Sequence, residues 1–194
     1  MPDQPKDQNA LAERFAHIPG LETAEKTPPV EEWNPPYHGE LAIHIDREGR
    51  WYYQGSPMTR DALVRLFASI LKREEDGAYY LVTPVEKFRI TVDDVPFVAH
   101  SAEEEGKGDA QIIWLRTNAG DTLALGERHP LIMREGGEAG EQVPYVVVRR
   151  NLLARVERNA FYHLVELAQE KTINGTFHLG ISSQGQFFSL GVAP

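Results

Sequence analysis

The sequence predicts an α+β protein of two small domains, in which antiparallel strands pack on one main helix in each domain. A hairpin pattern occurs twice, at residues 43–55 and 179–191, and every position of the second copy lies 136 residues after its counterpart. An amphipathic segment follows the first copy, and another precedes the second. Between them lies a stretch of short, strand-like segments. Together these observations indicate a repeated hairpin–helix motif.

Each hairpin copy has a polar residue three positions before a glycine. These pairs are Asp46 with Gly49, and Ser182 with Gly185. An Asp or Ser side chain can cap a type I turn, and glycine accepts the left-handed conformation that follows it. The glycine should therefore have a positive φ in both copies.

The loop length decides which side chains face the core. A two-residue loop is possible, but a three-residue loop with the glycine in a bulge keeps apolar side chains opposite apolar ones. We therefore favour the three-residue loop in both copies. It pairs Ile45 with Trp51, Ile43 with Tyr53 and, in the second copy, Ile181 with Phe187.

The N-terminal part predicts two helices and an extended arm. The first helix covers residues 8–17, and a proline-rich arm follows over residues 21–39, with Trp33 and Tyr37 as its anchors. The second helix starts at Thr59 as the N-cap and continues toward Asp76 and Gly77, which end it. Its apolar stripe is Leu63, Leu66, Phe67, Ile70 and Leu71.

The middle of the chain predicts strands, and a long helix follows them. The charged segment 103–108 is the expected domain boundary, which gives an N-terminal helix and arm (1–31) and two α+β domains (32–105 and 106–194). Asn151 would cap a helix that reaches about residue 169. A nested arrangement, with residues 78–148 as a central β-rich layer, is an alternative to two tandem domains. The expected strands are 78–82, 86–92, 95–101, 111–117, 122–126, 131–133 and 144–148.

Composition narrows the possible functions. The 194 residues carry a formal net charge of −9, which disfavours nucleic-acid binding because neutralisation of phosphates supplies most of that affinity. Cysteine is absent, so disulfides, thiolate metal sites and a cysteine nucleophile are excluded. We find no secretion signal and no apolar stretch long enough to span a membrane. We therefore expect a cytoplasmic protein that binds neither nucleic acid nor membrane.

Motifs for catalysis are missing as well. The histidines show no metal-ligand spacing, and the sequence contains no nucleophile elbow, phosphate loop or dinucleotide-binding pattern, so we expect no metal and no cofactor. His44 lies on the polar face of its strand, opposite Tyr52, and is replaced by Gly180 in the second copy. The hairpin itself therefore does not need this histidine, which is either a functional residue or an ordinary surface histidine.

The segment 83–87 is the most suggestive polar turn. Thr83, Glu86 and Lys87 would present a hydroxyl, a carboxylate and an ammonium group from a backbone made rigid by Pro84. The alternative is an ordinary proline turn whose Glu86 and Lys87 begin a strand on opposite faces.

Four motifs carry a resemblance to a known family. They are Trp33-Asn34-Pro35-Pro36, the segment from Gly49 to Met58, Leu81-Val82-Thr83-Pro84-Val85-Glu86-Lys87, and Val95-Pro96-Phe97. The chain resembles, from about Glu32 onward, the uncharacterised bacterial domain-of-unknown-function family 1285, which is found mainly in proteobacteria. The resemblance implies two α+β domains with a repeated structural motif and a link to signal transduction. It implies no catalytic residue, substrate or cofactor.

These observations lead to two hypotheses about function. The first is a non-enzymatic binding or regulatory module that recognises a small polar ligand or a partner protein. Its site would draw on Trp33, Tyr37, His38, His44, Thr83, Glu86 and Lys87. The alternative is an enzyme of unrecognised type, resembling a hydrolase, that uses His44 or His38 with a nearby carboxylate. The sequence does not determine the oligomeric state.

Overall fold

The computed structural model describes residues 7–15, 28–136 and 140–192. The chain divides into two consecutive compact units, residues 1–96 and 97–194. The charged segment 103–108, where the sequence suggested a boundary, lies inside the second unit, and Glu103 to Glu105 belong to one of its strands. Part of the expected arm, residues 21–27, lies outside the described residues.

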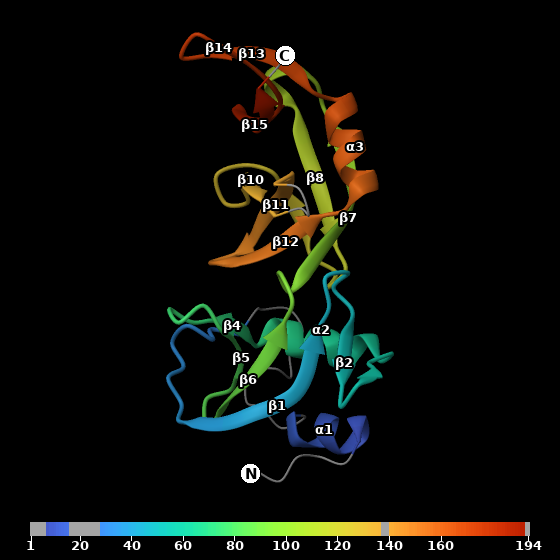
Figure 1. Cartoon of the computed structure of the whole chain (residues 1–194), viewed down its shortest axis with the longest axis vertical. Helices are drawn as coiled ribbons and strands as arrows, with labels where there is room; N and C mark the ends of the chain where they lie inside the picture. Colours follow the sequence, from blue (N-terminus) through green and yellow to red (C-terminus); the bar gives the residue numbers. More distant parts are fainter. Residues whose placement is uncertain (1–6, 16–27, 137–139, 193–194) are drawn as a thin grey trace. The chain divides into compact units, whose positions relative to one another are not determined.

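The first unit is built on a six-stranded sheet, sheet A, with the order β3-β2-β1-β6-β5-β4. Its two central strands, β1 and β6, run parallel, and the remaining neighbours are antiparallel (Figure 1). The strands are β1 (Tyr37–Ile45), β2 (Trp51–Tyr53), β3 (Ser56–Pro57), β4 (Leu71–Arg73), β5 (Tyr79–Val82) and β6 (Lys87–Val92).

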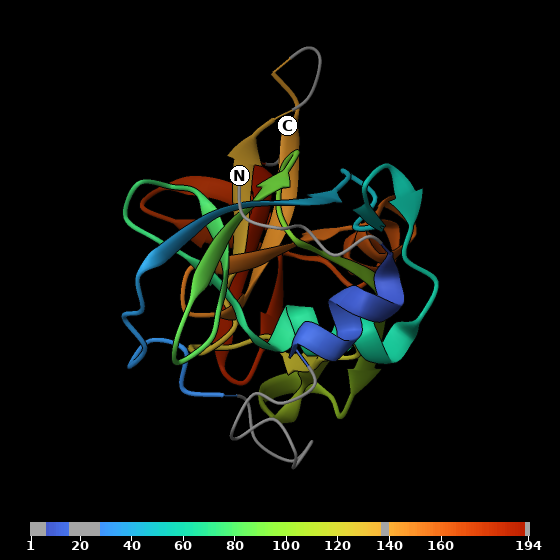
Figure 2. The ribbon, with the colours of Figure 1, turned by 90° about the horizontal axis from the view of Figure 1, so that it is seen from below.

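Two helices, α1 (Gln8–Phe15) and α2 (Asp61–Ser69), pack on one face of sheet A and lie beside each other (Figure 2). The ring of Phe15 in α1 meets the rings of Phe67 in α2 and Phe88 in β6 edge-on, with centroid distances of 5.1 and 6.3 Å. All three rings are fully buried. This aromatic cluster, together with the inward side chains of β1, forms the core of the unit.

The second predicted helix is shorter than expected. Its N-cap is Arg60, which makes no side-chain cap, rather than Thr59. The helix ends at Ser69, and Leu71 begins β4, which pairs with β5. The stripe therefore spans a helix and a strand, and its member Leu66 is only half-buried. Strand pairing, which places Leu71 opposite Leu81 in the core, outweighs the local preference for helix.

The second unit contains another six-stranded sheet, sheet B, with the order β10-β11-β12-β7-β8-β9. Its topology equals that of sheet A. Each sheet consists of two antiparallel meanders of three strands. In both sheets, the first strand of one meander pairs in parallel with the last strand of the other meander, β1 with β6 in sheet A and β7 with β12 in sheet B. The strands are β7 (Phe97–Glu105), β8 (Ile112–Thr117), β9 (Thr122–Ala124), β10 (Leu131–Glu135), β11 (Gln142–Arg149) and β12 (Leu152–Val156).

A three-stranded antiparallel sheet, sheet C, completes the second unit. It contains β13 (Gln169–Ile173), β14 (Thr176–Ser183) and β15 (Gln186–Val192), and it follows α3 (Arg158–Glu166). The short 3-10 helix η1 (Gly108–Ala110) lies between β7 and β8. The buried hydroxyl of Ser183 accepts from the N–H of Ile113 at 2.9 Å and donates to the carbonyl of Leu125 at 2.7 Å. This hydroxyl connects the tip of sheet C to sheet B, together with Gln111, which donates to the carbonyl of Ser182 and accepts from the N–H of Gln184.

The predicted fold class is wrong. The protein is mostly β, with three sheets and only three α-helices in the described part of the chain, and it does not consist of two domains that each pack on one main helix. The long helix expected from Asn151 is strand β12 and then the nine-residue helix α3. β12 pairs with β11 along one edge and with β7 along the other, and four of its five residues are buried, so its apolar residues do not show the alternation of a half-exposed strand.

The two hairpins differ in their loops. The predicted pairs Ile45–Trp51 and Ile43–Tyr53 are confirmed in β1 and β2. In sheet C, Ile181 lies opposite Phe188, so the predicted pairing with Phe187 is wrong. Gln184 and Gly185 there form a two-residue turn with φ values of 51° and 72°. The positive φ predicted for Gly49 and Gly185 is confirmed, with values of 73° and 72°.

Candidate functional site

One face of sheet A carries the polar side chains of its strands, while the opposite face supports α1 and α2. Along β1, Leu41, Ile43 and Ile45 are buried, so the side chains between them point to the other face. We call that side the polar face. The strand registers place on it Tyr37, Glu40, Ala42, His44, Tyr52, Pro57, Lys72, Tyr80, Val82, Lys87, Arg89 and Thr91.

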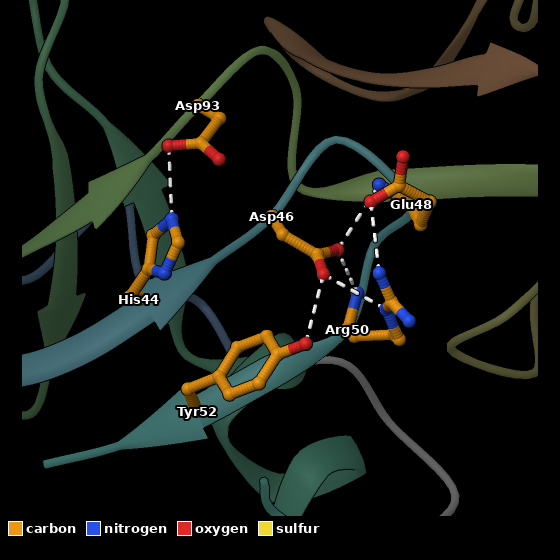
Figure 3. A network of polar contacts seen from close by, with 6 residues as sticks. All are labelled: His44, Asp46, Glu48, Arg50, Tyr52 and Asp93. Atoms are coloured by element: carbon orange, nitrogen blue, oxygen red, sulfur yellow. Dashed lines mark hydrogen bonds and ion pairs between the residues drawn. The ribbon is translucent and has the colours of Figure 1, made fainter. Parts of the chain in front are cut away.

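The polar face ends at the β1–β2 turn in a network organised by Asp46 (Figure 3). Oδ1 of Asp46 accepts from the backbone N–H groups of Glu48 and Arg50, at 3.0 and 2.9 Å. Oδ2 accepts from Nε of Arg50 at 2.8 Å and from the hydroxyl of Tyr52 at 3.0 Å. A single buried carboxylate thus fixes the turn and two side chains at once.

His44 joins this network through an aromatic contact and its own carboxylate. Its ring stacks on Tyr52, with a centroid distance of 5.8 Å and an angle of 26° between the planes. Nε2 of His44 lies 2.8 Å from Oδ1 of Asp93, which follows β6 (Figure 3). The N–H of Asp93 donates to the carbonyl of Ile45, so the parallel pairing of β1 and β6 positions this carboxylate. We call His44, Asp46, Glu48, Arg50, Tyr52 and Asp93 the His44 network.

Hydrogen bonding sets the protonation states of Asp46 and Tyr52. Burial of Asp46 acts to raise the pKa of its carboxyl group, but the hydrogen bonds from the Arg50 backbone, the Tyr52 hydroxyl and the Arg50 guanidinium lower the pKa below its usual value. The bond to Asp46 also raises the pKa of Tyr52. Asp46 is therefore ionised and Tyr52 neutral at neutral pH.

A second group of contacts on the polar face surrounds Tyr80, and we call it the Tyr80 cluster. Nζ of Lys87 lies 5.1 Å from the centre of the Tyr80 ring and donates to both carboxylate oxygens of Glu74 at 2.8 Å. The Tyr80 hydroxyl donates to Asp76 at 2.7 Å, which raises the pKa of Tyr80 to about 12. Tyr37 contacts the same ring edge-on at 6.3 Å.

The structure brings together three of the seven predicted site residues around Tyr80. Tyr37 and Lys87 are cross-strand neighbours in β1 and β6, and both contact its ring. The carbonyl of Trp33 accepts from Nζ of Lys72, the residue opposite Tyr80 in β4, at 3.5 Å.

The other four predicted residues lie elsewhere. Glu86 forms an ion pair with Arg14 of α1 at 3.0 Å, and the ring of His38 lies 5.9 Å from that of Phe88, so both belong to the helix-covered side. The hydroxyl of buried Thr83 is used within its own turn, where it donates to the carbonyl of Glu86. His44 lies toward the opposite end of β1 from Tyr37, in the network described above.

Three carboxylates that hold these rings were not among the predicted site residues. They are Asp93 beside His44, Asp46 beside Tyr52 and Asp76 beside Tyr80. The sequence predicted Asp46 only as the cap of the turn. The predicted pairing of His44 with Tyr52 was the available signal for the stack, and the structure confirms that pairing. The pairing of β1 with β6, which brings Asp93 to His44, has no local signal in the sequence.

In the described ranges, no group of three or more histidine, aspartate or glutamate side chains is placed to hold a metal ion. Among these residues, too, no helix has the length and apolarity that crossing a bilayer requires.

The fold and the site define a two-unit, mostly β protein in which one face of the first sheet carries preorganised polar and aromatic side chains. The chain belongs to the DUF1285 family, as the sequence resemblance implied. The N-terminal domain of this family, described as a domain of unknown function, matches residues 28–95, and the C-terminal domain, a protein of unknown function, matches residues 96–190.

Two solved structures are similar to this chain. A DUF1285 family protein from Silicibacter pomeroyi DSS-3 is 43% identical over 93% of each chain, with a TM-score of 0.81. A DUF1285 family protein from Shewanella baltica OS155 is 26% identical over 65% of this chain and 91% of its own, with a TM-score of 0.51. The chain matches no curated protein.

Proposed function

We propose that the protein is a non-enzymatic binding module that recognises a partner protein through the polar face of sheet A, with the His44 network as the centre of the contact. The observation that carries this proposal is the stack of His44 on Tyr52, in which each ring is held by its own carboxylate. A rigid, half-exposed aromatic pair with oriented polar atoms offers contact area at little entropic cost.

The exposure of the network favours a protein over a small molecule as the ligand. The side chains of His44 and Asp93 are both 41% exposed, and that of Arg50 is 66% exposed. A small ligand is normally enclosed in a concave site that removes most of its surface from water. A partner protein can cover an open sheet face instead. A regulatory role in bacterial signal transduction, which the family resemblance implied, is part of this proposal.

Affinity capture with matched variants tests the proposal. The bait is the full chain as wild type, as the double variant H44A/R50Q, or as R116Q, which breaks an exposed Arg116–Glu103 pair in the second unit. The proposal expects a bacterial protein that wild type and R116Q capture and H44A/R50Q loses. With that partner purified, Kd should increase at least tenfold for H44A/R50Q. Equal capture by all three folded baits contradicts the proposal.

A second candidate function has one specific observation in its favour. The enzyme alternative needs a histidine within hydrogen-bonding distance of a carboxylate, and His44 and Asp93 satisfy this condition. The exposure of both side chains counts against it, because general-base catalysis works best where water is excluded. Hydrolysis of an ester and phosphoester panel by wild type, abolished in H44A, would favour the enzyme over the binding module.

A further inference from the structure

Arg89 lies at the centre of the polar face of sheet A. It belongs to β6, one of the two central strands, and its side chain is exposed. In the neighbouring strands it lies opposite Tyr80 of β5 and Glu40 of β1. A partner protein that covers the polar face therefore buries Arg89 near the middle of the contact, where arginine is among the residues that contribute most to affinity.

Arg89 differs in its contacts from the other lysine and arginine side chains of the polar face and the His44 network. The others are each paired with a carboxylate: Lys87 with Glu74, Lys72 with Glu31 and Arg50 with Asp46. Within the described ranges, Arg89 takes part in no ion pair and donates no hydrogen bond. Its guanidinium therefore meets a partner protein with the N–H donors still unused by the described residues.

Two acidic residues lie near Arg89 without forming an ion pair with it. Hydrogen bonds from the hydroxyl of Tyr80 and the N–H of Ala78 lower the pKa of Asp76, and the charge of Arg89 adds to this effect. Asp76 uses both of its carboxylate oxygens in those two bonds, at 2.7 and 2.9 Å. Glu40 is exposed in β1, on the other side of Arg89. Arg89 is thus flanked by negative charge but is not neutralised by contact with it.

The geometry points to Arg89 as the anchor of the polar face, with a carboxylate of an aspartate or glutamate on the partner protein as its ligand. This inference rests on the function proposed above and adds the chemical group that the partner supplies. A guanidinium binds a carboxylate through two parallel N–H···O bonds, which make the pair both strong and directional. The hydroxyl of Thr91, exposed two residues further along the same face of β6, is an additional donor beside it.

The flanking acids restrict the sequence around the partner's carboxylate. Glu40 in β1 and Asp76 beyond β5 would repel a second acidic residue next to the one that Arg89 binds, because like charges brought together at an interface are unfavourable. The partner segment therefore carries a single acidic residue among basic or uncharged ones, and a polyacidic tract does not fit.

Carbodiimide coupling identifies the group that faces position 89. The probe is the partner that wild type captures in the experiment above, mixed with the full chain carrying R89K. The carbodiimide activates a carboxylate, the introduced amine attacks it, and an amide forms as a urea leaves. Mass spectrometry should locate an amide between position 89 and an aspartate or glutamate of the partner. The control R65K introduces the same amine at an exposed residue of α2, on the opposite side of sheet A, and should give no amide to the partner. An amide to Glu40 or Asp76 of the same chain in place of the partner, or an equal yield from R65K, overturns the inference.

Affinity for the purified partner separates this inference from the proposed function. R89Q should increase Kd at least tenfold and R65Q should leave it unchanged, while both variants keep the Tm of wild type because both side chains are exposed. An unchanged Kd for R89Q beside a tenfold loss for H44A/R50Q overturns the role of Arg89 and leaves the proposed function intact. Unchanged Kd values for both R89Q and H44A/R50Q, or no captured partner, overturn both.

Discussion

The hydroxyl of Tyr52 donates to the buried carboxylate of Asp46 at 3.0 Å, and this contact connects the β1–β2 turn to the aromatic stack of the polar face. The same carboxylate accepts from two backbone N–H groups of the turn. The position of the Tyr52 ring, and of the His44 ring above it, therefore depends on an acidic residue that faces the turn. Stability and recognition should both be sensitive to Asp46.

Asp46→Asn should destabilise the protein by about 2–3 kcal/mol. The amide oxygen can still accept from the N–H groups of the turn, but it carries no charge, and the amide NH2 cannot accept from Arg50 and Tyr52 as Oδ2 does. The pKa of Asp46 is lowered in the folded state, so its contribution is full above the unfolded-state pKa of about 4 and disappears as the pH falls through the folded-state value. The stability difference between wild type and the variant should therefore shrink below about pH 4. Urea denaturation at several pH values measures this difference.

Glu48→Gln is the matched control for Asp46→Asn, since Glu48 is an exposed partner of the same Arg50. Exposed ion pairs contribute little, so its stability should stay within about 0.5 kcal/mol of wild type. An equal loss in both variants would show that Asp46 has no special role in the turn.

Tyr80 should ionise late in an alkaline titration. Its hydrogen bond to Asp76 raises the pKa of the phenol to about 12. The stabilisation linked to the neutral phenol is therefore complete below the unfolded-state pKa of about 10 and is lost as the pH rises through about 12. Subtracting the ultraviolet titration of Y80F from that of wild type isolates this phenol, and D76N should shift its pKa down toward 10. A difference curve centred near pH 10 in wild type would refute the assignment.

The strands were the most predictable part of the fold. All seven strands expected between residues 78 and 148 are present, because alternation and turn residues are local signals. The register of the first hairpin was also predictable, because the position of Gly49 and the pairing of apolar with apolar side chains both favour a three-residue loop. In the second hairpin a shorter loop placed Ile181 opposite Phe188 instead.

Helix boundaries and the site required information that no local pattern contains. Leu153 and Val156 lie at helical spacing with Ala160 and Leu164, yet the first two belong to a strand that is buried on both sides. Asp93 reaches His44 only because β1 and β6 pair in parallel across 41 residues of intervening chain. Tertiary pairing thus decides both the strand identity of β12 and the membership of the His44 network.

Gly180 allows β14 and β15 to approach closely, and Gly180→Ala should destabilise the second unit by at least about 2 kcal/mol. An added Cβ would lie 2.3 Å from the carbonyl oxygen of Phe188 and 2.5 Å from the Phe187 ring. The carbonyl belongs to the strand backbone and cannot easily move. Gly191→Ala is the control, because nothing lies within 4 Å of its added Cβ. Thermal denaturation should show a clearly lower Tm for G180A than for G191A, and equal Tm values would contradict the packing.

Ser183→Ala should cost about 1–3 kcal/mol, because it leaves the buried N–H of Ile113 and carbonyl of Leu125 without their hydroxyl partner. Ser182→Ala, one residue earlier in the same strand, removes a hydroxyl from a side chain that is only half-buried, and it should change stability by less than about 0.5 kcal/mol. Chemical denaturation of both variants measures the difference. Identical values would mean that Ser183 does not connect sheet C to sheet B.

Site-specific photo-crosslinking tests the central claim, recognition of a protein through the polar face, most directly. A photoreactive phenylalanine analogue replaces Thr91, the exposed residue opposite His44 on the polar face, in one sample and Tyr162, an exposed tyrosine of α3 in the second unit, in the other. Illumination in bacterial cells should give a discrete crosslinked protein from position 91, lost when H44A/R50Q is added, and none from position 162. Equal crosslinking at both positions, or none at position 91, would contradict the account.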